Sequence, residues 1–292
     1  MSILEIPFFK SQGLGNDFLL LREEHLDGLR LPLPELAEKI CSRKFGVGAD
    51  GVIVWTADAA ADQFAARIFN ADGSEAESSG NGIRCLAAAL CHAGIARGER
   101  LSIRTSGGRK QVTVLSRASN VYTFRTDLGP ATFDPDAIPL ALPGPAGPPP
   151  LRLRLEAGDA TFEATPLAVG NPHCVVRVDR IDFNALYATG PLLERHPVFP
   201  ARANVEFVRV VDAATIEIAI WERGVGHTLS SGTGSAAAAV AAIANGWTDS
   251  PVLVHMEGGE TRVSWDRSGN VIQDGQAQFV FHGLIESHAL KY

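Results

Sequence analysis

The chain contains two glycine-rich segments with nearly the same wording. Residues 78–82 read Ser-Ser-Gly-Asn-Gly, and residues 230–234 read Ser-Ser-Gly-Thr-Gly. Each leads into an alanine-rich stretch that ends in a glycine. The two final glycines are separated by the same number of residues as the two glycine-rich segments. Because good helix formers follow each turn and a glycine stops them, the pattern predicts equivalent helices over 80–94 and 232–246.

The start of each predicted helix is suited to holding an anion. The first backbone N–H groups of a helix have no partner within it, and the helix dipole places partial positive charge there. Flanking glycines let a carboxylate or a phosphate approach that backbone closely. One such segment alone is more simply a helix cap over a core helix. Its repetition favours a duplicated domain with one binding site between the halves.

Composition and charge limit the classes of function. With 292 residues, 46% of them apolar and 20% charged, the chain has enough core for two globular domains or one large one. A net charge of −7 and the lack of Lys/Arg runs argue against nucleic-acid binding. Without a signal-peptide pattern or a run of about 20 apolar residues, we expect a cytoplasmic protein that does not enter membranes.

Neither the cysteines nor the acidic turns have the spacing of metal ligands. The four cysteines, Cys41, Cys85, Cys91 and Cys174, are scattered, which predicts buried thiols. Asp50 and Asp72 lie in glycine turns that lack the ligand density of a calcium loop. No metal is expected.

Each half is predicted to contain many strands and few helices. Besides the alanine-rich helices, we expect short helices at 34–43 and 183–192. The expected strands are 8–10, 18–21, 52–55, 65–69, 101–105, 110–116, 120–126, 165–169, 204–208, 214–221, 251–255, 261–265 and 276–281. A helix that is apolar on all sides must lie inside the structure. The predicted class is therefore α/β (α+β), with a curved, mostly antiparallel sheet around each alanine-rich helix.

The proline-rich stretch 139–150 marks the middle of the chain. It can be neither a helix nor a central strand, and we interpret it as a loop just after an interdomain boundary. The predicted halves are 1–128, to which the tail 282–292 can return, and 129–281.

A series of short motifs runs along the whole chain in addition to the repeat. They are Gly15-Asn16-Asp17-Phe18, Gly48-Ala49-Asp50-Gly51, Asn70-Ala71-Asp72-Gly73-Ser74-Glu75, Gly80-Asn81-Gly82-x-Arg84-Cys85, Gly170-Asn171-Pro172-His173, Asn204-Val205-Glu206-Phe207, Glu222-Arg223-Gly224-x-Gly226-x-Thr228 and Gly232-Thr233-Gly234. In their order and spacing, these motifs resemble those of diaminopimelate epimerase. The resemblance implies two pseudo-symmetric domains with the active site in the cleft between them, and a homodimer. It also implies cofactor-free conversion of LL- to meso-diaminopimelate, for lysine and peptidoglycan precursors.

The resemblance also implies a set of substrate contacts. They are the side chains of Asn16, Asn70, Asn171, Asn204, Glu222 and Arg223, and the backbone of Gly80, Asn81, Gly232 and Thr233. A glutamine contact of some family members falls on Gly51 here and is expected to be absent. The residue types agree with an amino-acid ligand, because Arg223 can hold a carboxylate in a bidentate manner and Glu222 an ammonium group.

The family's two catalytic cysteines immediately precede the two Gly-x-Gly turns, where this chain has Ser79 and Ser231. Epimerisation needs a base on one face of the α-carbon and an acid on the other. A thiol has a pKa of about 8.5, which a helix N-terminus lowers, whereas a serine hydroxyl needs a neighbouring base. Binding is therefore better supported by the sequence than turnover.

Several explanations of the two serines stay open at this point. The chain can be a natural epimerase that uses Ser79 and Ser231, or polar neighbours such as His173, Glu222 and His227. It can be a relative with a changed reaction, including another isomerase of this fold that uses Glu222, or an amino-acid binding protein without turnover. It can also be a laboratory Cys→Ser double variant made to trap substrate. His173 either packs in its turn or tunes a proton at the site, while His227 and Cys85 are expected to be structural.

Overall fold

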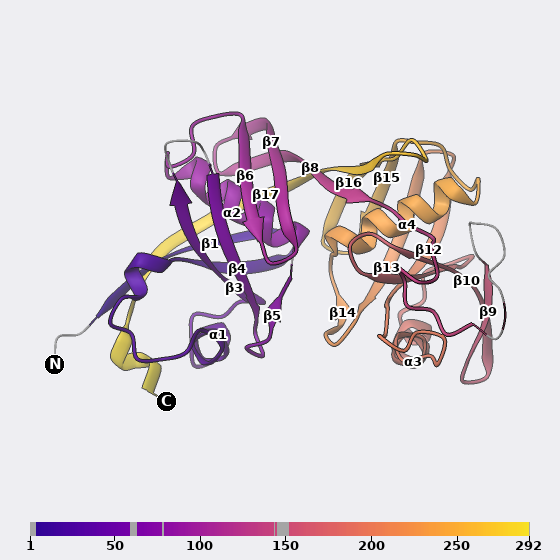
Figure 1. Cartoon of the computed structure of the whole chain (residues 1–292), viewed down its shortest axis with the longest axis horizontal. Coiled ribbons are helices and arrows are strands. Elements are labelled where there is room, and N and C mark those ends of the chain that lie inside the picture. The colour runs from indigo at the N-terminus through magenta and orange to yellow at the C-terminus, as the bar shows by residue number, and fades with distance from the viewer. Residues whose placement is uncertain (1–3, 59–62, 78, 143, 145–151, 292) are drawn as a thin grey trace. The chain divides into compact units, whose positions relative to one another are not determined.

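Both alanine-rich segments form buried helices, one in each of two structural units (Figure 1). The computed structural model describes residues 4–58, 63–77, 79–142, 144 and 152–291. Unit 1 comprises Met1–Thr126 with Gly275–Tyr292, and unit 2 comprises Asp127–Asp274. Strands surround the central helix in each unit, which confirms the predicted fold class.

Unit 1 is a closed sheet around α2. Its elements are β1 (Glu5–Gly13), β2 (Asn16–Arg22), η1 (Glu23–Leu26), α1 (Leu33–Cys41), β3 (Gly51–Asp58), β4 (Gln63–Asn70), β5 (Glu75–Ala76), α2 (Gly80–His92), β6 (Arg100–Thr105), β7 (Gly108–Ala118), β8 (Val121–Pro130), β17 (Asn270–Glu286) and η3 (Ser287–Lys291). Neighbouring strands follow the order β17-β1-β2-β3-β4-β6-β7-β8, and β8 also pairs with β17. The pairs β2–β3 and β4–β6 are parallel.

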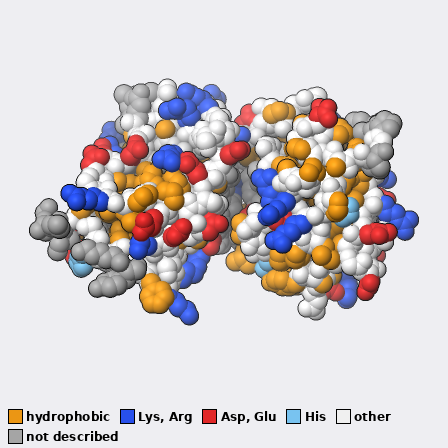
Figure 2. Space-filling view, turned by 60° about the horizontal axis from the view of Figure 1, so that its bottom comes forward, with side chains coloured by type: hydrophobic (Ala, Val, Ile, Leu, Met, Phe, Trp, Pro, Cys, Tyr) orange, Lys and Arg blue, Asp and Glu red, His pale blue; other side chains and the backbone are white. Residues whose placement is uncertain are grey.

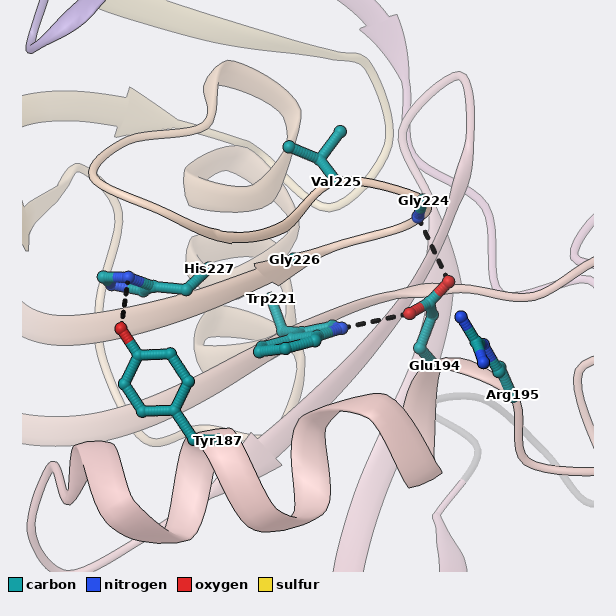
Figure 3. A pocket seen from close by; sticks show the side chains of 8 residues that line it. All are labelled: Tyr187, Glu194, Arg195, Trp221, Gly224, Val225, Gly226 and His227. Carbon is teal, nitrogen blue, oxygen red and sulfur yellow. Dashed lines mark hydrogen bonds between the residues drawn. The ribbon is translucent and has the colours of Figure 1, made fainter. Parts of the chain in front are cut away.

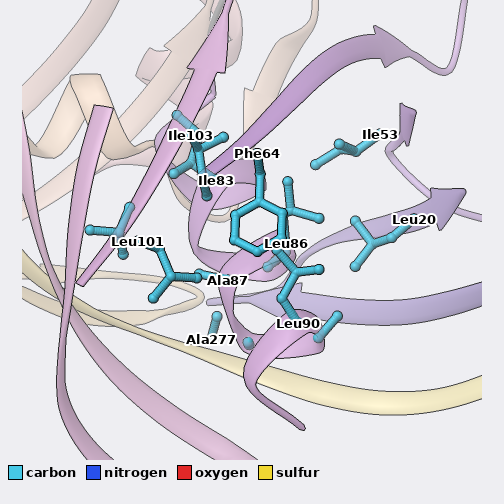
Figure 4. Close-up of a cluster of buried hydrophobic side chains, with 14 of the residues drawn as sticks. Leu20, Ile53, Phe64, Ile83, Leu86, Ala87, Leu90, Leu101, Ile103 and Ala277 are labelled. Atoms are coloured by element: carbon cyan, nitrogen blue, oxygen red, sulfur yellow. The ribbon is translucent and has the colours of Figure 1, made fainter. Parts of the chain in front are cut away.

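The core of unit 1 explains why α2 is so rich in alanine. Every residue from Gly80 to Cys91 is buried, so strands must approach the helix from all sides. The larger side chains of α2 pack against strand residues of the same cluster, as Figure 4 shows for Ile83, Leu86 and Leu90. The small alanines between them let the surrounding backbone come close, which keeps the interior densely packed.

Unit 2 repeats the connectivity of unit 1. Its elements are β9 (Leu153–Ala157), β10 (Ala160–Ala168), β11 (Pro172–Arg177), α3 (Phe183–Glu194), β12 (Asn204–Asp212), β13 (Thr215–Glu222), β14 (Gly226–Thr228), α4 (Gly232–Ala244), β15 (Val252–Met256), β16 (Gly259–Ser264) and the first residues of β17. Helix α3 joins the parallel pair β11–β12 as α1 joins β2–β3. Helix α4 joins the parallel pair β13–β15 as α2 joins β4–β6. The repeat of the sequence is thus a repeat of topology.

Both central helices end slightly before the glycines that stop them. Gly94 and Gly246 have φ values of 68° and 70°, the left-handed region that glycine adopts most easily. The chain then folds back so that the Ile95 N–H donates to the Leu90 carbonyl at 3.0 Å, and the Trp247 N–H to that of Ala242 at 2.8 Å. These bonds satisfy carbonyl groups that the helix end leaves without partners.

Two expectations from the sequence differ in detail. The strand expected at 276–281 is the centre of a 17-residue strand, β17. Residues on both sides of that segment also alternate between more and less buried positions, but the polar residues among them hide this alternation in the sequence. In the proline-rich stretch, residues 139–142 and 144 form neither helix nor strand, as expected. The remaining residues of that stretch, 143 and 145–150, lie outside the described residues.

Acidic and basic side chains are interspersed with apolar ones on the face shown in Figure 2. Among the described residues, no helix has the length and apolar character needed to cross a membrane.

Candidate functional site

In unit 1, two of the predicted contact residues lie at the same end of the sheet. Asn16 begins β2, and Asn70 ends β4. The strand β3 lies between them, with Gly51 opposite Phe18 on one side and opposite Asn70 on the other. Strand register therefore brings together two asparagines that are far apart in the sequence.

A network of charges holds the turn that carries Asn16. The Asn16 side-chain amide donates to the Asp50 carboxylate at 3.0 Å. Arg43 donates to both Asp17 and Asp50, at 2.8 and 2.7 Å, and Lys10 lies 2.5 Å from Asp17. Burial alone would raise the pKa of Asp17, but the contacts with Arg43 and Lys10 outweigh it and lower that pKa to about 2. Asp17 therefore stays ionised, which keeps the turn in place.

Close packing accounts for the glycine at position 51. A Cβ added there would lie 2.7 Å from the Phe69 carbonyl oxygen and 3.0 Å from the Phe18 ring. A glutamine at this position would require both neighbours to move. This packing agrees with the prediction that the glutamine contact is absent.

The N-terminus of α2 lies at this same end of the unit 1 sheet. A Cβ on Gly13, which pairs with Asn16, would lie 3.7 Å from the Asn81 Cβ in the first turn of α2. Ser79 is the N-cap: its backbone is extended, and its Oγ accepts from the Gly82 N–H at 3.1 Å. The hydroxyl thus occupies the position expected for a capping side chain. Asn81 is buried, and its side-chain oxygen accepts from Arg84.

In unit 2, the corresponding strand ends carry the predicted contacts. Asn204 begins β12 opposite His173, and its side-chain amide donates to the Pro172 carbonyl at 3.0 Å. Its side-chain oxygen accepts from the Arg223 N–H at 3.0 Å. Glu222 ends β13, immediately before Arg223. A single asparagine therefore ties together the segments that contain His173, Glu222 and Arg223.

A buried glutamate supports the turn after Arg223. Glu194 accepts from the Gly224 N–H at 3.1 Å and from the Trp221 indole at 3.0 Å, as Figure 3 shows. These residues line a cavity of about 430 Å³ between α3 and β14, which is bounded by Tyr187, Glu194, Arg195, Trp221, Gly224, Val225, Gly226 and His227. The cavity contains none of the predicted contact residues. His227 there lies 2.9 Å from the Tyr187 hydroxyl and 2.5 Å from Glu257.

Helix α4 begins in the same way as α2. Ser231 is an extended N-cap whose Oγ accepts from the Gly234 N–H at 3.2 Å. Ser231 is buried, whereas Ser79 is half-buried. Both serines therefore stabilise the first turn of a buried helix. Gly232 and Thr233 follow Ser231 directly and contribute the first N–H groups of α4.

Next to this helix start lies a buried acid–base pair. His173 Nδ1 is 2.7 Å from Glu206 Oε1, and His173 Nε2 is 2.8 Å from the Asn171 side-chain oxygen. Both His173 and Glu206 are fully buried. Glu206 is a residue to which the sequence interpretation gave no role, although it stands in the same short motif as Asn204.

The cysteines are packed in the core near these contacts: a Cβ on Gly13 would lie 3.5 Å from Cys85 Sγ. All four are free and buried, as predicted. Burial raises the pKa of the Cys41 and Cys85 thiols to about 12 and raises that of Cys174 as well. Such thiols are poor bases and nucleophiles at neutral pH. Among the described residues, no cluster of three or more His, Cys, Asp or Glu side chains could hold a metal ion.

Comparison with known sequences gives matches over nearly the whole chain. The family model for diaminopimelate epimerase matches residues 8–133 and 166–280. The diaminopimelate epimerase of Pelotomaculum thermopropionicum is 40% identical over 276 residues, which cover 94% of this chain and 97% of that protein. The diaminopimelate epimerase of Synechococcus elongatus is 40% identical over 283 residues, covering 97% and 99%.

Solved structures with little sequence similarity share the fold. A hydroxyproline epimerase from Agrobacterium vitis, with bound trans-4-hydroxy-L-proline, has a TM-score of 0.67 at 14% identity and covers 97% of this chain and 93% of its own. A methylitaconate-delta-isomerase has a TM-score of 0.63 at 14% identity, covering 100% and 98%. At this level of identity, the likeness shows the architecture alone.

Proposed function

The chain belongs to the diaminopimelate epimerase family, and from that premise we propose that it interconverts LL- and meso-diaminopimelate. The reaction uses the protein's own side chains, without a cofactor, and supplies lysine and peptidoglycan precursors. We place the enzyme in the cytoplasm as a homodimer. The observation that carries the proposal is the pair of serine-capped helix starts, which offer the same backbone donors in both units.

In this proposal, the substrate carboxylate and ammonium group bind to different chemical groups. The N–H groups at Gly80-Asn81 and Gly232-Thr233 and the guanidinium of Arg223 receive the carboxylate. Glu222 receives the ammonium group. The amides of Asn16, Asn70, Asn171 and Asn204 complete the polar contacts. Most of these groups are already fixed by hydrogen bonds within their own unit, so little ordering is needed when the ligand binds.

The proton transfers are proposed to take place at Ser79 and Ser231, with His173 and Glu222 as polar helpers. A helix dipole contributes about 0.3–2 kcal/mol, which is too little to ionise a serine hydroxyl without another base. The serines therefore serve as proton carriers rather than as ready-made bases. We expect turnover to be slow in comparison with a chain that has thiols at these positions.

Solvent isotope exchange tests this function. LL-diaminopimelate is incubated with the protein in D2O, and loss of the α-proton signal is followed by NMR. We expect slow exchange with the chain as it stands. With Ser79→Cys and Ser231→Cys combined, the rate should rise by about a hundredfold to ten-thousandfold, the usual contribution of a matched acid–base group. Iodoacetamide should inhibit only the double cysteine variant, because the native thiols are buried.

Two outcomes would count against the proposed function. If calorimetry detects tight binding but neither protein exchanges the proton, the chain is an amino-acid binding protein on this scaffold. If Glu222→Gln abolishes exchange and the cysteine pair does not accelerate it, the chain is a different isomerase that uses a carboxyl group.

A further inference from the structure

We infer that Glu206 is a positioning residue of unit 2 that provides Ser231 with the base a serine needs, while His173 holds Glu206 in its ionised form. The inference rests on the proposed function. It concerns a residue on β12 whose side chain is fully buried and that forms no part of the predicted substrate contacts.

The position of Glu206 beside Ser231 follows from the glycine in the first turn of α4. A Cβ on Gly234 would lie 2.9 Å from Glu206 Oε1 and 3.1 Å from Ser231 Oγ. The carboxylate and the hydroxyl therefore both border the space that a side chain at position 234 would fill. Replacing Gly234 by a larger residue would push the two groups apart.

Two groups in this part of the chain have unused hydrogen-bonding capacity: one is an acceptor and the other is a donor. Glu206 Oε2 is buried and has no hydrogen-bond partner among the described residues. The Ser231 oxygen accepts from Gly234, but within the described part of the chain no acceptor takes its hydroxyl hydrogen. A buried acceptor without a donor is costly. The Glu206 oxygen that borders the space at Gly234 is Oε1, which also contacts His173, so the inference requires the Ser231 hydroxyl to reach this carboxyl group by rotation of one of the two side chains.

His173 faces oxygen atoms on both of its ring nitrogens. Nδ1 contacts Glu206 Oε1, and Nε2 contacts the Asn171 side-chain oxygen. Both ring nitrogens are thus engaged by side-chain oxygens, which fixes the orientation of the ring beside the Glu206 carboxyl group. Burial raises the pKa of Glu206 above its ordinary range, and His173 counteracts this by favouring the ionised form. The result is a carboxylate that is more basic than a solvated one.

The equivalent position in unit 1 is apolar. A Cβ on Gly82 would lie 3.1 Å from Ile53 Cδ1 and 3.2 Å from Ser79 Oγ. Ile53 on β3 thus occupies the place in unit 1 that Glu206 on β12 occupies in unit 2. The two helix starts share their capping geometry, but among the described residues the side chain nearest to the Gly82 position is apolar, whereas the one nearest to the Gly234 position is a carboxylate.

The proton transfer in unit 2 then proceeds in one concerted step. The Ser231 O–H bond breaks as its proton passes to a Glu206 oxygen, and the Ser231 oxygen takes the α-proton of the substrate. The electron pair of the broken C–H bond stays on the substrate, whose carboxylate is held by backbone N–H groups. In the reverse step the substrate regains a proton from Ser231, and Glu206 returns the other one.

The test compares Glu206→Gln in two backgrounds. In the native chain, this change should lower the α-proton exchange rate by about a hundredfold or more, with unchanged affinity for diaminopimelate. In a Ser231→Cys chain, the thiolate is its own base, and the loss should stay below about tenfold. As a matched control, Glu194→Gln alters another buried glutamate of unit 2, and its effect should be the same in both backgrounds. Equal losses for Glu206→Gln in both backgrounds would overturn the inference.

A second readout does not depend on turnover. Nitrogen-15 NMR should show the His173 ring nitrogen that contacts Glu206 in a hydrogen bond in the native chain, and this signal should change in Glu206→Gln. A His173 signal that is the same in both proteins would overturn the inference even if the protein is an active epimerase. If no variant exchanges the substrate proton while His173 behaves as expected, the proposed function fails and the His173–Glu206 contact stands. If Glu206→Gln does not fold, Gly234→Ala separates the same groups and should reproduce the loss of rate.

Discussion

A local balance of charge decides the conformation of the turn that carries Asn16. Asp17 is largely buried and therefore depends on its cations. Because Arg43 and Lys10 hold its pKa at about 2, well below the value of about 3.9 in an unfolded chain, Asp17 stabilises the fold at neutral pH. The contribution is about 2 kcal/mol. The Asn16 side chain is held by Asp50, and Arg43 links Asp50 to Asp17, a connection that sequence patterns alone do not reveal.

The sign of this effect gives a test at the residue scale. A depressed pKa adds stability that is present above about pH 4 and is lost as the pH falls through about 2. Asp17→Asn should therefore lower the free energy of unfolding at pH 7 by about 2 kcal/mol. The gap between variant and native chain in urea denaturation should close towards pH 2. A gap that stays constant between pH 7 and pH 2 would show that the charge of Asp17 is not responsible.

At the scale of single elements, features that depend on neighbouring residues can be predicted from the sequence better than contacts between residues that are distant in the sequence. The helix starts at Ser79 and Ser231 and the glycine stops are recognisable because a cap and its helix lie within a few residues. The pairing of His173 with Glu206 depends instead on two parallel strands joined by α3, which no local pattern indicates. The support of Gly224 by Glu194 depends on the same kind of distant contact. The helix starts could therefore be predicted from the sequence, whereas the contacts of Glu206 and Glu194 could not.

The caps themselves give the prediction for this scale. Ser231→Ala removes the oxygen that accepts from Gly234 and should cost about 1 kcal/mol of stability. Ser231→Gly should lower the free energy of unfolding by only a few tenths of a kcal/mol relative to the native chain, because glycine is itself a good N-cap. Urea denaturation of both variants measures the difference. Equal loss in the two variants, or a larger loss with glycine, would argue that Ser231 stabilises the fold by packing rather than by capping.

At the scale of the whole molecule, the chain is one plan of strands and helices used twice, with different chemistry at equivalent places. The aligned glycine-rich segments predicted the repeat. Its asymmetry, with Ile53 in one unit and Glu206 in the other, became visible only when strand register put these residues at matching positions. The two units therefore share a topology but differ in charge at this equivalent position.

The most direct test of this account follows backbone amides by NMR during titration with diaminopimelate. The N–H signals of Gly80 and Gly82 in α2 and of Gly232 and Gly234 in α4 should shift along a single saturation curve. Gly94 and Gly246, which follow the opposite ends of the same helices, serve as controls and should not move. Shifts in only one unit, or at the control glycines alone, would contradict the claim that both serine-capped helix starts bind the substrate.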